Sequence, residues 1–290
     1  MKGLALGRYA PYNSFVHRLD PRSKLLALVL LMVAVFYGYS TQVMTFVMGG
    51  LLLLIIFILL LVSHISLRQL FSSLKALWIM IIILLVINVL VPPLGATRVA
   101  FSFGTYPVFW ESILQSAKII LRLVMMLALT LILTATTKPL DLTYALEWHM
   151  TPLKLIKFPT HEIAMTISIA LRFIPTLLDE TMRIMNAQAS RGVDFEHGKI
   201  KEKITAILSL IVPLFMSAFQ RSEELANAME ARGYNPRGKR TRYRNLAWHV
   251  GDTFSLLFIV VLTAGVIVVS TMNWNLIEII FKIPTWSVLL

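Results

Sequence analysis

Two arginines of this chain stand in the same short phrase, which occurs twice. Residues 186–192 read Asn-Ala-Gln-Ala-Ser-Arg-Gly, and residues 227–233, which lie 41 positions later, read Asn-Ala-Met-Glu-Ala-Arg-Gly. A guanidinium group can hold a carboxylate through two parallel hydrogen bonds in a partly desolvated groove. Arginine followed by glycine is also typical of an ordinary helix C-terminus, where the cation complements the helix dipole. Both interpretations apply to each copy, and the repetition favours a shared contact function.

Two long helices must position these phrases. Helical periodicity extends from His161 to Ser190, with a kink expected at Pro175, and again from Ile204 to Arg232. On each helix the polar side chains recur at steps of three and four, so they share one face. They are Arg172, Thr176, Asp179, Arg183 and Asn186 on the first helix, and Gln220, Glu224 and Asn227, followed by Ala231, on the second. We therefore expect a narrow polar stripe along each helix.

The composition indicates a membrane protein. Of the 290 residues, 57% are hydrophobic and only 14% are charged, whereas ordinary soluble domains have about a quarter charged residues. The absence of cysteine excludes disulfides, thiolate metal ligands and cysteine nucleophiles. The net charge of +12 follows membrane topology, and the basic run 237–244 is typical of an anchor to anionic lipid. The expected contact is therefore the lipid bilayer and not nucleic acid.

Five membrane spans are predicted. The uncharged run from Leu25 to Val62 is about twice as long as one span, and it contains turn formers in residues 37–42, so it forms a helical hairpin. The other spans are residues 76–91, 108–137 and 253–277. The basic residues before the first span place the N-terminus in the cytoplasm, and an odd number of spans places the C-terminus outside. Residues 94–106 are expected to form a short extracellular turn or hairpin.

The region 138–247 is expected to form a cytoplasmic platform of two to three long helices. It has sixteen Lys or Arg and eleven Asp or Glu, a bias typical of the cytoplasmic side, but it is too apolar for a solvated loop. The predicted fold class is an all-α membrane protein in three parts. Residues 1–137 hold four spans, residues 138–247 hold the platform, and residues 248–290 hold the last span.

Two cations, Lys118 and Arg122, lie one helical turn apart inside the fourth span. Charges within a span are costly and usually face protein or water. These side chains either snorkel or pair within the helical bundle, or they contact a partner membrane protein. Both interpretations stay open.

No residue pattern predicts an active site or a metal centre. His161-Glu162 lacks the second histidine of a zinc protease helix. Residues 233–240 match the first seven positions of a phosphate-binding loop, but Arg240 replaces the Ser or Thr that binds magnesium. We therefore expect no metal, no cofactor and no catalytic residue, and a chain that couples to a partner.

The arginine phrases and their surroundings resemble one known family, the transmembrane component of energy-coupling factor transporters, which import vitamins and transition-metal ions into prokaryotes. Family proteins carry two arginine-centred motifs at the ends of cytoplasmic coupling helices. The matching residues are Ser190-Arg191-Gly192, with serine where alanine is commonest, and Ala231-Arg232-Gly233. Further matching stretches are Leu19-Asp20-Pro21-Arg22-Ser23-Lys24-Leu25, Thr136-Thr137 with Pro139, Asp179-Glu180 with Arg183, and residues 228–234.

The resemblance implies a non-catalytic scaffold in the prokaryotic cell membrane. It would dock on two ATPase subunits of the ATP-binding-cassette type, which bind the ATP, and hold a small substrate-binding membrane protein (S component). The six residues of the two arginine motifs would contact the ATPases. The supporting residues on the coupling helices would be Asp179, Glu180, Arg183, Asn186, Glu224 and Asn227.

Two other functions are alternatives. A conventional permease would line its own substrate path with inward polar residues, but the spans apart from the fourth hold few such residues besides Asn88 and some Ser and Thr. A membrane-embedded enzyme would need one of the active-site patterns that the sequence lacks.

Overall fold

A computed structural model of the chain describes residues 12–38, 42–91, 99–103, 106–195, 199–235, 238 and 246–272. Some predictions concern segments that lie partly outside these residues. They are the turn 37–42, the stretch 94–106, the match to a phosphate-binding loop at 233–240, the basic run 237–244 and the end of the last span.

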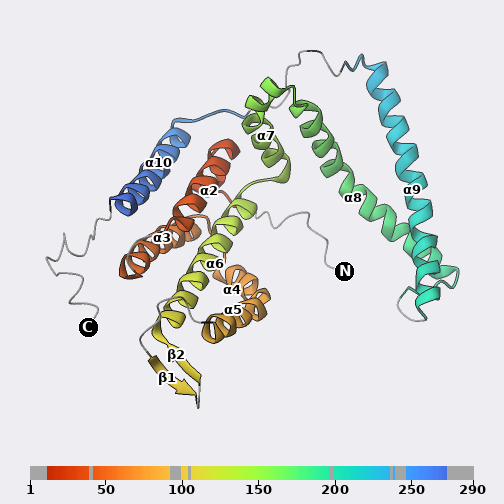
Figure 1. Ribbon diagram of the computed structural model, residues 1–290. Coiled ribbons are helices and arrows are strands. Elements are labelled where there is room, and N and C mark those ends of the chain that lie inside the picture. The colour runs from red at the N-terminus through yellow and green to blue at the C-terminus, as the bar shows by residue number, and fades with distance from the viewer. Residues whose placement is uncertain are drawn as a thin grey trace. The chain divides into compact units, whose positions relative to one another are not determined.

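The described residues are almost entirely helical and divide into two compact units (Figure 1). Unit 1 comprises residues 1–145 and 246–290, and unit 2 comprises residues 146–245. The elements of unit 1 are α1 (Phe15–Arg18), α2 (Pro21–Phe36), α3 (Gln42–Val62), α4 (Leu67–Ala76), α5 (Trp78–Leu90), β1 (Val99–Phe103), β2 (Tyr106–Phe109), α6 (Trp110–Thr136) and α10 (Val250–Thr271). Helix α7 (Pro139–His149) contains the division, and unit 2 continues with the 3₁₀ helix η1 (Thr151–Ile156), α8 (Thr160–Ser190) and α9 (Ile200–Ala231).

The prediction of an all-α membrane protein is confirmed. Among the described residues, five helices are long and apolar enough to cross a membrane, namely α3, α6, α8, α9 and α10. The pair α4 and α5 passes the same test together but bends by 57° between the two helices. Helix α2, the expected first span, has 16 residues. Helices α8 and α9 are the least apolar of the five candidates, and their location on the cytoplasmic side stays a prediction.

Several helices begin at other residues than the expected spans do. Helix α2 begins at Pro21 and not at Leu25, because the Asp20 side chain accepts the Arg22 N–H at 2.8 Å and proline suits the first helical position. Between the expected second and third spans lies helix α4, whose buried Leu70 follows the helical spacing of the leucines around it. The third span begins after a break at Leu77.

The expected hairpin before the fourth span is present as the antiparallel pair β1 and β2. It extends to Phe109, so helix α6 starts at Trp110 and not at Val108. Proline does not end either long helix of unit 2, since Pro175 and Pro213 lie inside α8 and α9.

The core of unit 1 follows from the spacing of its apolar residues. The buried side chains of α3 recur at every fourth position, as Met44, Met48, Leu52, Ile56 and Leu60, which places them on one helical face. This face packs against α6, where a side chain at Gly49 would meet Leu121 at 2.8 Å. The opposite face of α3 exposes Leu54, Phe57 and Leu61. Exposed apolar side chains of this size fit a helix that is surrounded by lipid.

Helices α8 and α9 of unit 2 form an antiparallel pair (Figure 1). Helix α9 exposes one continuous apolar face from its first turns to about two thirds of its length: Ile204, Ile207, Leu208, Ile211, Val212, Phe215, Met216 and Phe219. An exposed apolar surface of this extent indicates contact with a partner protein or a membrane.

Candidate functional site

The first arginine phrase ends helix α8 through backbone hydrogen bonds. Gly192 has a φ of 87°, in the left-handed region that favours glycine. Its N–H donates to Ala189 O at 2.9 Å, and the Val193 N–H donates to Gln188 O at 3.1 Å. These two bonds form a Schellman motif, which satisfies the last carbonyl groups of a helix. Arg191, just before the glycine, is the C-cap residue.

Helix α9 ends in the same way. Gly233 has a φ of 72°, its N–H donates to Glu230 O at 2.8 Å, and the Tyr234 N–H donates to Met229 O at 3.0 Å. The C-cap residue Arg232 has φ −89° and ψ 8°, compared with −90° and 7° at the first C-cap. The two phrases therefore present their arginines from the same backbone conformation.

The guanidinium groups of Arg191 and Arg232 are available to a partner. Both residues are exposed, and so are the small residues Ser190 and Ala231 before them. Neither arginine side chain forms a hydrogen bond, ion pair or ring contact with any residue that the structure describes. Because the backbone bonds already terminate both helices, neither guanidinium group is needed as a hydrogen-bonding cap.

The polar stripe that the sequence predicts on each helix is exposed. This holds for Asp179, Arg183 and Asn186 on α8 and for Glu224 and Asn227 on α9. On each helix the exposed polar residues precede the C-terminal arginine along the chain.

Glu180 differs from the other supporting residues, because it is partly buried and joins the two helices. Its carboxylate lies 3.7 Å from the Arg221 guanidinium of α9. The same guanidinium lies over the Phe173 ring of α8, 5.9 Å from its centroid. Sequence reasoning missed Arg221, although its place one position off the polar stripe of α9 gave a signal that it faces a neighbouring helix.

The two arginines lie at opposite ends of the helix pair. The chain passes from the end of α8 to the start of α9 within ten residues, and these two helix ends lie close together (Figure 1). Arg191 is the C-cap residue at this end of α8. Arg232 follows the 32 residues of α9, which span about 48 Å at about 1.5 Å per residue. Two sites so far apart cannot enter one groove of a single small protein.

The site therefore offers two matched cations on helix ends, each suited to a carboxylate. Within the described parts of the chain, no group of three or more His, Asp or Glu residues could hold a metal ion.

Comparisons with known proteins identify the family. The model of the CbiQ cobalt transport protein family matches residues 12–243. The energy-coupling factor transporter transmembrane protein EcfT of Macrococcus caseolyticus is 44% identical over 260 residues, which cover 90% of this chain and 96% of that protein. The chain belongs to this family. The protein of the same name from Bacillus subtilis is 40% identical over 264 residues, covering 91% of this chain and 97% of the relative. The resemblance that the arginine phrases suggest is thereby confirmed.

In this member of the energy-coupling factor family, the stretch 19–25 contributes to a buried polar clasp in unit 1. The Asp252 carboxylate accepts the Asp20 N–H at 2.6 Å and the His249 N–H at 2.7 Å. Ser23 Oγ donates to Asp20 O at 2.8 Å. Asp20 and Asp252 are only 4% and 1% exposed. The clasp thus fixes the start of α2 to the start of α10.

Arg22 extends this clasp to helix α7. Its guanidinium group donates to Tyr144 Oη and, at 3.3 Å, to Leu246 O, and it lies over the Tyr144 ring at 4.6 Å from the centroid. Sequence reasoning used this stretch as a sign of family resemblance and its basic residues as a sign of membrane topology. Its structural role could not be read from the sequence, because the partners lie more than a hundred positions away.

The two cations of the fourth span have different surroundings. The Arg122 guanidinium donates to Phe36 O at 3.3 Å and to Tyr37 O at 3.4 Å, which are the last carbonyls of α2. Arg122 thus contacts the bundle, as one of the two interpretations expects. Lys118 is partly buried and lines a small cavity with Arg122. Contact of Lys118 with a membrane partner stays a prediction.

Proposed function

We propose that this protein is the energy-coupling scaffold of an importer of the energy-coupling factor type. It transmits the motion of two ATPase subunits to a small substrate-binding membrane protein, and the ATPases bind the ATP. The observation that carries the proposal is the pair of matched helix ends, which present exposed arginines from one backbone conformation.

Each arginine enters an acidic groove on one ATPase subunit. Arginine suits this contact because its planar guanidinium group binds a carboxylate through two parallel hydrogen bonds. The group also stays charged when it is partly desolvated. The separation of about 48 Å along α9 requires two grooves, and the matched chemistry of the two ends fits two similar subunits.

The polar stripes extend each contact along its helix. Asp179, Arg183 and Asn186 support the first arginine, and Glu224 and Asn227 support the second. The ion pair between Glu180 and Arg221 transmits force between the two helices, so that motion at one ATPase reaches both. The exposed apolar face of α9 contacts the substrate-binding protein or the inner membrane surface.

The membrane orientation follows from the charge bias. The N-terminus and unit 2 are cytoplasmic, and the C-terminus is outside. A permease with its own substrate path receives little support, because a groove of about 550 Å³ in unit 1 is lined mainly by apolar side chains.

The test is a charge reversal at both helix ends, Arg191→Glu with Arg232→Glu. Reversing a partly buried ion pair forces like charges together at roughly 3–5 kcal/mol, so each contact should weaken by at least about 10²-fold. The tagged double variant should insert normally into the membrane but lose both ATPase subunits on purification, as identified by mass spectrometry.

Arg172→Glu is the matched control. It makes the same charge change at an exposed position of α8, 19 residues or about 28 Å before Arg191, and should retain both ATPases. If the double variant binds both ATPases as the control does and supports ATP-driven uptake, the proposal is wrong.

A further inference from the structure

The first turn of α2 contacts the chain at both places where it passes between the two units. The chain leaves unit 1 after Ala145, within α7, and returns to it at Leu246, shortly before α10. Arg22 contacts Tyr144 on the outgoing side and Leu246 on the returning side. Because Arg22, Tyr144 and Leu246 all belong to unit 1, these contacts are part of the packing of that unit.

One nitrogen atom forms both hydrogen bonds. Arg22 Nη2 donates to Tyr144 Oη and, at 3.3 Å, to Leu246 O. A guanidinium group is planar, and its N–H groups point in fixed directions. The two acceptors are therefore held in fixed positions relative to each other and to the start of α2. A movement of one connection without the other would break one of the two bonds.

The guanidinium group of Arg22 is itself held in place. Its Nε lies 3.7 Å from the Asp20 carboxylate, and the side chains of Arg22 and Asp20 are only 14% and 0% exposed. The Asp20 N–H in turn donates to the Asp252 carboxylate at 2.6 Å, which fixes the start of α10 to the same turn of α2. Charge-assisted hydrogen bonds of this kind are stronger than those between neutral groups. Arg22 thus belongs to a buried network that includes the start of α10.

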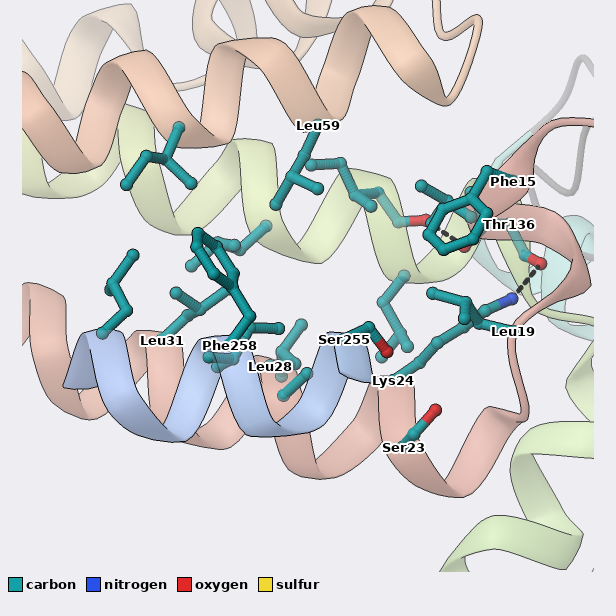
Figure 2. Close-up of a pocket in the computed structure, with 18 of the residues that line it drawn as sticks. Phe15, Leu19, Ser23, Lys24, Leu28, Leu31, Leu59, Thr136, Ser255 and Phe258 are labelled. Atoms are coloured by element: carbon teal, nitrogen blue, oxygen red, sulfur yellow. Dashed lines mark hydrogen bonds between the residues drawn. The ribbon is translucent and has the colours of Figure 1, made fainter. Parts of the chain in front are cut away.

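Lys24 adds a further connection from the start of α2 to the outgoing chain. Its ammonium group donates to the carbonyl group of Thr136, the last residue of α6, at 3.1 Å (Figure 2). It also lies among the carboxylates of Asp20, Asp141 and Asp252, which attract it. Asp141 is in the first turn of α7. The start of α2 therefore holds the outgoing chain at the end of α6 and again in α7.

We infer that Arg22 is the positioning residue that passes the motion of α8 and α9 to the helices of unit 1. The inference rests on the proposed function, in which the ATPases move these two helices. A displacement of unit 2 pulls on both connections of the chain, and the Nη2 bridge delivers it to α2. Through Asp20 and Asp252 the same displacement reaches α10. Without the bridge, each connection moves separately and the start of α2 stays in place.

The test uses the complete transporter, purified with its ATPases through a tag on this chain and placed in nanodiscs. Mass spectrometry measures hydrogen exchange with and without ATP and vanadate at the ends of α8 and α9 and at the starts of α2 and α10. In the wild type, ATP and vanadate should change exchange in all four regions. The readout is this nucleotide-dependent difference. A residue that only stabilises the fold would raise exchange in both conditions and leave the difference unchanged.

Arg22→Lys keeps the charge but replaces the planar guanidinium group by a single ammonium group. The nucleotide-dependent difference at the starts of α2 and α10 should fall at least threefold, while the difference at the ends of α8 and α9 stays the same. Hydrolysis of ATP, measured as phosphate release, should stay within twofold of the wild type. Arg18→Lys makes the same change at an exposed position and should behave like the wild type.

Tyr144→Phe removes one acceptor of the bridge and keeps the ring, so it tests the inference even if Arg22→Lys fails to assemble. It should also lower the difference at α2 and α10 at least threefold, and Tyr12→Phe, at an exposed position, is its control. The inference alone is overturned if α8 and α9 respond to ATP but α2 and α10 of the wild type do not, or if an assembled bridge variant keeps the full difference. A wild type without bound ATPases, or without a response at the ends of α8 and α9, would overturn the proposed function and this inference with it.

Discussion

Unit 1 and unit 2 use their charged residues in opposite ways. In unit 1, Asp20 and Asp252 are buried. The Asp252 carboxylate accepts the N–H groups of Asp20 and His249, and one oxygen of the Asp20 carboxylate accepts the Arg22 N–H. In unit 2, Arg191 and Arg232 are exposed at the ends of long helices. Buried charges that accept hydrogen bonds hold helices together, whereas exposed charges on rigid ends are available to other proteins. Substitutions in unit 1 should therefore affect stability first, and those at the helix ends should affect assembly first.

The largest loss of stability is expected for Asp252→Ala. The change leaves the N–H groups of Asp20 and His249 without their acceptor. Each charge-assisted hydrogen bond contributes about 1.5–3 kcal/mol, so the loss of both should be about 3–6 kcal/mol. Thermal unfolding in detergent measures it. Asp179→Ala, at an exposed position of α8, should unfold like the wild type. Equal midpoints for the two variants would show that the clasp does not stabilise unit 1.

A smaller loss, confined to the helix ends, is expected for Gly192→Ala and Gly233→Ala. Both glycines have positive φ, and a left-handed conformation costs other residues about 1–2 kcal/mol. A Cβ atom would meet no other atom within 4 Å at either site, so strain in φ is the whole effect. Hydrogen exchange of the last turn of α8 and α9 should speed up.

Gly50→Ala in α3 is the control for these glycines. Its Cβ also meets nothing within 4 Å, but it lies inside a helix, where alanine is favoured over glycine by about 1 kcal/mol. Unchanged exchange at the ends of α8 and α9 in the two tip variants would contradict the Schellman geometry.

The sequence predicted those features that depend on local pattern. Long apolar runs located α3, α6 and α10, and helical periodicity located α8 and α9. The Arg-Gly phrases located both ends of the long helices, because glycine at a helix C-terminus acts within a few residues. The sequence did not predict the ion pair between Glu180 and Arg221 or the hydrogen bond from the Asp20 N–H to the Asp252 carboxylate. These contacts join residues far apart in the chain, and only the packing of helices brings them together.

The ion pair between Glu180 of α8 and Arg221 of α9 should contribute modestly to the stability of the protein. It should have a larger effect on the distance between the two helices. Arg221→Ala removes a partly exposed pair, which is worth about 0.2–1 kcal/mol. Distances between spin labels near residues 190 and 231 should become more broadly distributed. The swap Glu180→Arg with Arg221→Glu should restore a narrow distribution. A broad distribution in the swap as well would assign the effect to the stacking of Arg221 on Phe173 and not to the ion pair.

An effect on stability of similar size, without a change in helix spacing, is expected for Arg122→Gln. Its guanidinium group contacts the last carbonyls of α2, and a cation at a helix C-terminus contributes about 0.3–1 kcal/mol. Thermal unfolding should shift slightly, and the yield of the co-purifying membrane partner should stay the same. A lower yield of the partner at an unchanged unfolding midpoint would favour the alternative interpretation, in which this face contacts the partner.

The contact between the helix ends and the ATPases is tested most directly by photo-crosslinking in the assembled transporter. A photoreactive amino acid replaces Ser190 or Ala231, the small exposed residues beside the two arginines. The account predicts that each position crosslinks to an ATPase subunit, with the same residue placed at Thr166, an exposed position near the start of α8, as the negative control. Crosslinks from positions 190 and 231 to lipid, or to no ATPase at all, would contradict the account.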